Sequence, residues 1–396
     1  MKTQIAKNYF QGTKNNTLFN KKGLTLFLVL IIIPFSFTNA QNTSLSITQS
    51  SELIDVGKYQ EAYGILTSAI RTQPNDKTLY FERGKVKFLM NDFYGAAGDF
   101  GFAIELDSSF SEAFNFRGLA IQYNGDPELA INDFTKAIEL NPVNAEAYSN
   151  RGFSFYALES YEYAYFDFTK AIELSPKNPD MYYNRGFVRL DLGEFIGAID
   201  DFNKSIELDS LDAETFKLRA DAEYQIGALE ASLYDYTRAI ELDSTDELKY
   251  ASRAQVFSEL ENYDEAINDY TIALTLFEDK YEQDPELYNL RGVVYYNAQK
   301  YNEAIEDYTV AIDLEPSASL LYENRGAAFF DQSKFIEAVQ DYTMAIDLDP
   351  NNPENYYFRS QAKFELNNKL DGCLDLKKAI EMGLVEVRKE LKEKCN

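Results

Sequence analysis

The chain has 396 residues, of which 45% are hydrophobic and 26% are charged, a composition typical of a folded protein rather than a disordered one. Its 65 acidic and 38 basic side chains give a formal net charge of −27, and such a surface repels the phosphates of nucleic acids and anionic lipids. The chain has no histidine, which excludes histidine bases, histidine-containing catalytic triads and imidazole metal ligands. We therefore expect neither a nucleic-acid-binding protein nor an enzyme with a histidine-dependent site.

The N-terminal segment differs in composition from the rest. Five lysines precede an apolar stretch from Leu24 to Phe37, and the small residue Ala40 follows it. A basic region, a short apolar core and a small residue before the cleavage point are typical of a secretory signal peptide. The apolar core is shorter than the about 20 residues that a membrane-spanning helix needs. Residues 1–40 are therefore predicted to be a signal peptide, with an uncleaved anchor as the alternative. We expect an exported protein, periplasmic or secreted, without stable membrane insertion after cleavage.

Between positions 41 and 384 one pattern recurs at a regular interval. Nine arginines in this region each have an aspartate 16 residues later, at position i+16 for an arginine at position i. The arginines follow one another with a period of about 34 residues, and a fixed period of this size indicates a stacked array in which each repeat is one supersecondary unit. Ten repeats are predicted, beginning near residues 43, 77, 111, 145, 179, 213, 247, 285, 319 and 353.

The repeat from 145 to 178 illustrates the expected local structure. Tyr148, Gly152 and Phe155 are spaced four and three residues apart, as on one face of a helix, and a second stretch with the same spacing follows. Pro176 ends the second helix because proline lacks the amide that the next turn requires. No strand is predicted. The fold class is therefore all-α, with two helices in each repeat.

This pattern resembles the tetratricopeptide repeat family, whose period is about 34 residues and whose small residues stand at places 8 and 20 of each repeat. Counting the first residue of each repeat as place 1, place 4 is aromatic in nine repeats, and small residues recur at places 8 and 20. The resemblance covers residues 43 to 384. It implies a right-handed α-solenoid that serves as a non-enzymatic scaffold and binds a protein or an extended peptide in its concave groove.

The chain departs from the family at places 7 and 23, where the arginine and the aspartate replace the usual apolar residues. Both are absent together from the first repeat, which has Gln49 and Ile65 instead, and both are present together in the last repeat. This distribution favours pairing within one repeat. Both places flank the apolar stripes of their helices, so we expect the ion pairs to be half-buried and structural. The expected pairs include Arg151 with Asp167, Arg185 with Asp201, and Arg325 with Asp341.

The spacing between repeats changes once. Four extra residues lie near 277–285, between the seventh and eighth repeats, because Arg253 and Arg291 are 38 residues apart. We expect these residues to lengthen the preceding helix or to enlarge the loop after it, since length variation collects in loops. A contact with a partner is the alternative.

The residues after the last repeat are predicted to close the array. Residues 385–396 are expected to form an amphipathic capping helix that covers the apolar end of the solenoid. Cys373 and Cys395 are the only cysteines. In an oxidising compartment they would join this cap to the second helix of the tenth repeat by a disulfide. The alternative is that they are two small, buried apolar residues.

The resemblance places the binding surface on places 2, 5, 9, 12 and 13 of the first helix of each repeat. Exposed aromatic side chains at these places are candidate contact residues, because they bury a large area at a low entropic cost. At place 12 the alternative is that the aromatic ring simply supports packing. The candidates are Phe81, Phe153, Tyr156, Tyr183, Phe187, Tyr224, Tyr296, Phe330 and Phe364.

The net charge indicates which partner would fit this surface. An acidic groove with aromatic residues favours a basic or polar protein partner with apolar anchors. No phosphate-binding loop or dinucleotide motif occurs in the sequence, so we expect no cofactor, no metal and no catalytic residues. The main alternative is capture of a glycan or small molecule on the aromatic rings, and a carboxylate-based hydrolase is a third hypothesis. Binding of a basic protein should weaken as salt rises, whereas stacking on sugars should not.

Overall fold

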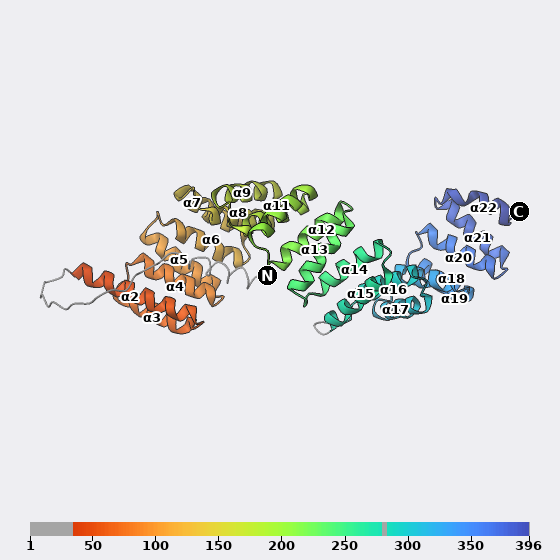
Figure 1. Cartoon of the computed structure of the whole chain (residues 1–396), viewed down its shortest axis with the longest axis horizontal. Helices are drawn as coiled ribbons and strands as arrows, with labels where there is room; N and C mark the ends of the chain where they lie inside the picture. Colours follow the sequence, from red (N-terminus) through yellow and green to blue (C-terminus); the bar gives the residue numbers. More distant parts are fainter. Residues whose placement is uncertain (1–34, 279–282, 396) are drawn as a thin grey trace. The chain divides into compact units, whose positions relative to one another are not determined.

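The computed structural model describes residues 35–278 and 283–395, and every regular element in that part of the chain is helical (Figure 1). The chain divides into two compact units, Met1–Leu192 and Gly193–Asn396, each of which is an array of helical hairpins. The fold is an α-solenoid, as the sequence predicted. Most of the predicted signal peptide lies outside the described residues. Residues 35–40 belong to the first described helix.

The first unit contains four helical hairpins followed by the first helix of the fifth repeat. Each helix packs on the next one along the chain. The helices are α2 (Phe35–Asp55), α3 (Tyr59–Thr72), α4 (Lys77–Leu89), α5 (Phe93–Leu106), α6 (Ser111–Tyr123), α7 (Pro127–Leu140), α8 (Ala145–Ala157), α9 (Tyr161–Leu174) and α10 (Pro179–Asp191).

The second unit begins with the second helix of the fifth repeat and ends with the closing helix. Its elements are α11 (Phe195–Leu208), α12 (Ala213–Gln225), α13 (Leu229–Leu242), α14 (Glu247–Glu259), α15 (Tyr263–Glu278), α16 (Pro285–Asn297), α17 (Tyr301–Leu314), α18 (Ser319–Asp331), α19 (Phe335–Leu348), α20 (Pro353–Glu365), α21 (Lys369–Glu381), η2 (Val385–Val387) and α22 (Arg388–Cys395).

Two local signals fix where the helices begin. Most first helices start after an aspartate or asparagine whose side chain accepts a hydrogen bond from a free amide of the first turn, as Asp246 does from Leu248. The two helices of each hairpin are joined at place 15, where the backbone is left-handed with φ between 56° and 98° in all ten repeats. Six of these ten residues are not glycine. The ten residues are Gly57, Asn91, Gly125, Glu159, Gly193, Gly227, Glu261, Gln299, Ser333 and Asn367.

In five repeats the core of the hairpin is built from a glycine and a ring. The ring at place 24 of the second helix lies against the glycine at place 8 of the first helix. A Cβ atom added to Gly84 would lie 2.6 Å from Cε1 of Phe100, which is fully buried. In the tenth repeat the arrangement is reversed, because the ring of Phe364 on the first helix lies against Gly372 on the second. This reversal explains why the last repeat has glycine where the others have alanine or serine.

The structure bears on two expectations about the second unit, one about the four extra residues and one about the closing helix. The helix before the four extra residues, α15, has 16 residues where α13 and α17 have 14, and residues 279–282 lie outside the described part. The closing segment is not one continuous helix. A short 3₁₀ turn (η2) precedes α22, because the chain turns at Gly383, where φ is 118°.

Candidate functional site

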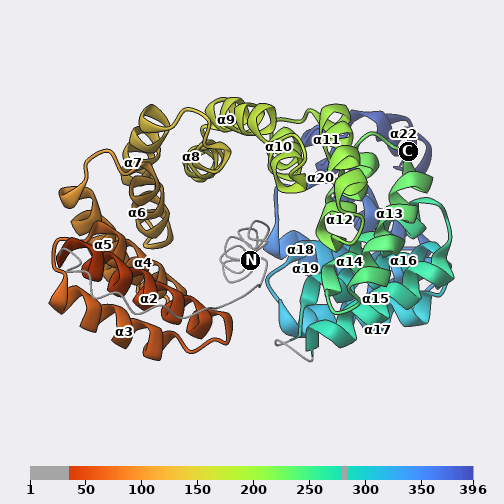
Figure 2. The same cartoon turned by 60° about the vertical axis from the view of Figure 1, so that its left-hand side comes forward.

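The first helices of the repeats share one face in each unit. In the first unit α4 contacts α6, α6 contacts α8 and α8 contacts α10; in the second unit α16 contacts α18 and α18 contacts α20. Within the first unit, α4, α6 and α8 lie on the inner side of the arc, and α5, α7 and α9 lie on its outer side (Figure 2). We call the surface formed by places 2, 5, 9, 12 and 13 of the first helices the inner face.

The arginine and aspartate of a repeat form a two-point ion pair. Arg325 donates from Nε and Nη2 to Oδ2 and Oδ1 of Asp341 at 2.8 and 2.9 Å. The aspartate is 5% exposed, and the arginine side chain is 18% exposed. The same two hydrogen bonds occur in Arg83/Asp99, Arg117/Asp133, Arg151/Asp167, Arg219/Asp235, Arg253/Asp269, Arg291/Asp307 and Arg359/Asp375.

The fifth repeat's predicted pair falls on the boundary between the two units. Arg185 lies on α10 of the first unit and donates from Nη1 to Thr169 Oγ1 at 3.3 Å. Asp201 lies on α11 of the second unit and is 3% exposed.

Most of these arginines have a further contact that we did not predict from the sequence. Arg325 Nη1 donates to Thr309 Oγ1 at 3.1 Å, and Thr309 lies on the second helix of the preceding repeat. The arginine therefore joins two successive repeats as well as the two helices of its own. A signal was present in the sequence, because threonine recurs at place 25. These threonines are Thr67, Thr135, Thr169, Thr237, Thr271, Thr309 and Thr343.

The distribution of these threonines fits a contact between repeats. Thr67 lies in the first repeat, which lacks the ion pair, and it accepts a hydrogen bond from Arg83 of the second repeat. The tenth repeat has Lys377 at place 25 instead, and Arg359 is the last arginine of the repeated series. Across the four extra residues Arg291 still reaches Thr271 at 3.0 Å. The contact between helices is therefore retained although the sequence separation is four residues longer.

One repeat carries an acid beside its ion pair. Glu223, at place 11 of the sixth repeat, lies next to the buried Asp235, and Glu223 Oε2 is buried without a hydrogen-bond partner. Lysines stand at place 11 in two other repeats, where Lys87 and Lys363 contact the paired aspartate at 2.9 and 2.7 Å. Burial, and then the charge of Asp235, raises the pKa of Glu223 to about 7. This carboxyl group therefore changes its protonation state near neutral pH.

The tyrosines at place 12 are bonded to the next repeat. Tyr156 donates its hydroxyl to Asp191, Tyr224 to Glu259, and Tyr296 to Asp331. Burial, and then the hydrogen-bonded carboxylate, raises the pKa of Tyr224 to about 12 and raises that of Tyr156 and Tyr296 further. These tyrosines therefore help to hold neighbouring repeats together, and their rings remain partly exposed on the inner face.

Four predicted contact residues of the first unit form one aromatic cluster. The rings of Tyr183 and Phe187 on α10 are stacked with centroids 6.4 Å apart, and Tyr156 on α8 lies 5.2 Å from Phe187. Phe153, one turn before Tyr156, packs against the buried ring of Phe168 at 5.1 Å. Phe153, Tyr156, Tyr183 and Phe187 are each half-buried. We call these four residues the aromatic cluster.

Phe81 is not a surface residue, contrary to our expectation. It is 8% exposed and packs against Phe110 at 4.9 Å and against Phe116 at 5.3 Å. Phe81 is therefore buried by phenylalanine rings of its own repeat and of the next one. Phe330 is half-buried and packs against Phe335 of its own repeat at 5.3 Å.

The closing helix covers part of the last repeat. Cys373 and Cys395 form a disulfide with their Cα atoms 5.7 Å apart, and this bond attaches α22 to α21. Lys394 of α22 lies over the ring of Phe364, with its Nζ 4.7 Å from the ring centroid. Phe364, a predicted contact residue for a partner, is therefore in contact with the chain's own C-terminal helix.

The acidic residues are concentrated in the second unit. Residues 193–396 contain 44 acidic and 20 basic side chains, whereas residues 35–192 contain 21 and 13, so the net charges are −24 and −8. On the inner face of the second unit the acids include Asp221, Glu259 and Asp331. A cationic partner would be attracted to this unit first.

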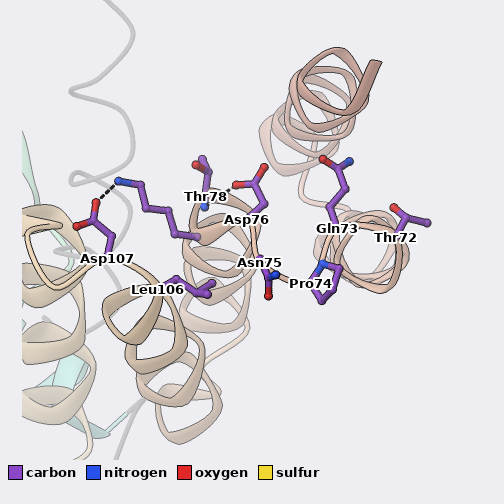
Figure 3. A pocket seen from close by; sticks show the side chains of 9 residues that line it. Thr72, Gln73, Pro74, Asn75, Asp76, Thr78, Leu106 and Asp107 are labelled. Atoms are coloured by element: carbon purple, nitrogen blue, oxygen red, sulfur yellow. Dashed lines mark hydrogen bonds and ion pairs between the residues drawn. The ribbon is translucent and has the colours of Figure 1, made fainter. Parts of the chain in front are cut away.

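The hollow in Figure 3 lies where two repeats of the first unit meet. Residues of the loop before α4 (Pro74, Asn75 and Asp76) line it together with Leu106 and Asp107 at the end of α5. Asp76 caps α4 by accepting from Thr78 N at 2.9 Å, and Lys77 at the start of α4 is paired with Asp107. These polar groups are engaged in structural bonds at the junction between the two repeats.

Within residues 35–278 and 283–395 no helix combines the length and the apolar character needed to cross a membrane. The same ranges contain no cluster of histidine, cysteine, aspartate and glutamate that could hold a metal ion.

Comparison with known families agrees with the repeat architecture. A tetratricopeptide repeat model matches residues 145–178 and 319–352, a second model described as TPR repeat matches 118–159 and 294–333, and a third, also described as tetratricopeptide repeat, matches 179–210. No match was found among curated proteins.

Several solved structures are similar over part of the chain. YrrB, described as a TPR protein with an unusual peptide-binding site, is 22% identical over 52% of this chain and 99% of its own, with a TM-score of 0.43. MamA is 24% identical over 42% of this chain and 92% of its own, with a TM-score of 0.39. PilF of Pseudomonas aeruginosa is 18% identical over 56% of this chain and 98% of its own, with a TM-score of 0.47.

Proposed function

The chain is a tetratricopeptide repeat protein, and from this premise we propose that it binds a protein or an extended peptide along the inner face of its repeats. Such repeats form scaffolds for protein interactions, and no catalytic family is indicated for this chain. The proposal therefore concerns where the partner binds and what its chemistry is.

The observation that carries the proposal is the aromatic cluster on α8 and α10. Phe153, Tyr156, Tyr183 and Phe187 come from two adjacent repeats and remain partly exposed on the inner face. Half-buried rings present a large apolar area whose position is already fixed by packing. Little conformational entropy is therefore lost when a partner covers it. Because the chain is strongly acidic, the partner is basic or polar, with apolar side chains that fit between these rings.

The test compares inner-face and outer-face aromatic residues. The mature chain is used to capture proteins from an extract of its own source, and each captured protein is then purified and titrated. The inner-face variant is Phe153→Ala/Tyr183→Ala/Phe187→Ala. We expect it to lose at least tenfold in affinity, since truncating a central aromatic contact commonly costs about 2 kcal/mol or more.

The matched control removes outer-face rings of the same unit. Tyr94, Tyr163 and Phe166 lie on second helices and are 83%, 66% and 65% exposed. The variant with alanine at these three positions should bind as the unmodified chain does. Retention of every captured protein by the inner-face variant would show that the surface is wrongly placed. Binding of a glycan, unaffected by salt, would favour the alternative of sugar capture.

We also propose that the mature protein is exported and begins near residue 41. The basic and apolar N-terminal sequence supports this proposal, and so does the disulfide between Cys373 and Cys395, since such bonds persist in oxidising compartments. Mass spectrometry of the protein from its source should give an N-terminus near residue 41. An intact Met1 on the exported protein would favour an anchor, and a cytosolic protein would contradict the proposal.

A further inference from the structure

The closing helix shows how the inner face holds a cation. Lys394 of α22 donates from Nζ to Oε1 of Gln361 at 2.9 Å, and the same atom lies 4.7 Å from the centroid of the Phe364 ring. Gln361 and Phe364 stand at places 9 and 12 of the tenth repeat, which are inner-face places. The chain's own lysine therefore occupies the surface that our proposed function assigns to a partner.

A second residue of α22 is bound at the same face. Glu390 is one helical turn before Lys394 and is paired with it at 2.8 Å. Burial, and then the carboxylate of Glu390, raises the pKa of Tyr357, which stands at place 5 of the same repeat. Places 5, 9 and 12 of one repeat thus contact two residues on one side of a short helix. An ammonium group over a ring is attracted by the negative face of the ring, and the attraction grows as the group is desolvated.

The same combination of ring and oxygen recurs, uncovered, in the second unit. Tyr224 is hydrogen-bonded to Glu259, and Tyr296 is hydrogen-bonded to Asp331. Each site has an aromatic ring at place 12, and the oxygen beside it belongs to a carboxylate at place 13 of the next repeat, whereas in the tenth repeat the oxygen is that of Gln361 at place 9. In the described part of the chain no lysine or arginine lies over either tyrosine ring. A carboxylate beside the ring attracts an ammonium group more strongly than an amide does.

We propose that the inner face of residues 193–396 binds lysine side chains of a helical partner segment, with each ammonium group over a place-12 tyrosine and beside its carboxylate, as Lys394 is held over Phe364. This inference rests on the proposed function and specifies its partner. The net charge of −24 in this unit, from 44 acidic and 20 basic side chains, supports a cationic segment. Tyr224 and Tyr296 are then contact residues as well as links between repeats.

The test uses the full mature chain and a defined probe. The probe is a fluorescein-labelled, lactam-bridged helical peptide with the sequence of residues 385–395, in which serine replaces the cysteine. A bridge is needed because a helix of this length is marginal in water. The comparison peptide has norleucine in place of the lysine that corresponds to Lys394, which keeps the length and removes the charge. We expect the lysine peptide to bind about tenfold more tightly and to weaken as salt rises.

Variants of the chain then locate the binding. Tyr224→Leu/Tyr296→Leu should weaken the lysine peptide about tenfold, and circular dichroism checks that the fold is retained. Since these tyrosines also link repeats, a second variant, Glu259→Gln/Asp331→Asn, keeps both rings and removes only the charges. It should also weaken the lysine peptide. The control is Tyr234→Leu on the outer side of α13, where the ring is 62% exposed.

Three results would overturn the inference. They are equal affinity for the lysine and norleucine peptides, no binding of either at millimolar concentration, and unchanged affinity in both inner-face variants. None of these results affects the capture experiment with the aromatic cluster, which belongs to the first unit. Failure of the lysine inference can therefore be distinguished from failure of the proposed function.

Discussion

Removing one arginine of the repeated ion pairs should destabilise its repeat strongly. In Arg325→Ala the side chain that donates two hydrogen bonds to Asp341 and one to Thr309 is lost. Asp341 is 5% exposed, so its carboxylate would remain buried without a counter-charge. Breaking a buried pair in this way costs about 3–5 kcal/mol. The arginine side chain is 18% exposed, so water can reach the carboxylate after its removal. We therefore expect Arg325→Ala to lower the free energy of unfolding by about 3 kcal/mol, the lower end of this range.

The matched control is another arginine of the same unit. Arg238 pairs with Glu241 three residues away on the surface, with side chains 38% and 54% exposed. Exposed pairs of this kind contribute about 0–1 kcal/mol, so Arg238→Ala should change stability little. Urea unfolding followed by circular dichroism gives the total loss. Hydrogen exchange of residues 285–352 shows whether the loss begins in the eighth and ninth repeats, since repeat arrays open locally.

A double variant separates charge from packing. In Arg325→Met/Asp341→Leu no charge is left unpaired, and apolar replacement of a buried pair is often neutral or stabilising. We expect it to recover most of the stability that Arg325→Ala loses. If Arg325→Ala destabilises the chain no more than Arg238→Ala does, the pairs are not structural and our reasoning is refuted.

Three further predictions concern the second unit. The pKa of Glu223 is about 7 in the folded chain, and its ordinary value is 4.5. Between these pH values the folded chain binds more protons than the unfolded chain, so the free energy of unfolding should fall as the pH rises from 4.5 to 7. The free energy of unfolding of Glu223→Gln should therefore equal that of the unmodified chain near pH 4.5 and be about 1–2 kcal/mol larger near pH 8, a value reduced because Glu223 is partly exposed. A difference between the two urea midpoints that does not change with pH would contradict this. Ser333 has a φ of 61°, so Ser333→Gly should raise stability by about 1 kcal/mol in thermal melts, and a loss would show that no strain is present. Cys373→Ser/Cys395→Ser should speed hydrogen exchange in residues 388–395 and lower the free energy of opening α22 by up to about 3 kcal/mol. Unchanged exchange would show that α22 is held in place without the disulfide.

The amino-acid sequence determined the period, the two helices of each repeat and the aspartate that pairs with the place-7 arginine in eight repeats. These features repeat at fixed intervals, and the i, i+16 spacing brings places 7 and 23 together on two antiparallel helices. The fold class follows from such local rules, because each hairpin contacts mainly its neighbours in sequence. The threonine at place 25 also recurs, but only the packing of successive repeats shows that Thr309 accepts a hydrogen bond from Arg325.

The tertiary structure decided which of the aromatic residues can meet a partner. Phe81 and Tyr183 stand at the same place of their repeats, yet Phe81 is buried by neighbouring phenylalanine rings and Tyr183 stays partly exposed. Likewise, the sequence of α22 indicates a cap but not that Lys394 reaches Phe364. Burial of a side chain depends on the volumes of all its neighbours in space. A repeating pattern specifies where each residue stands in its repeat but not the volumes that surround it.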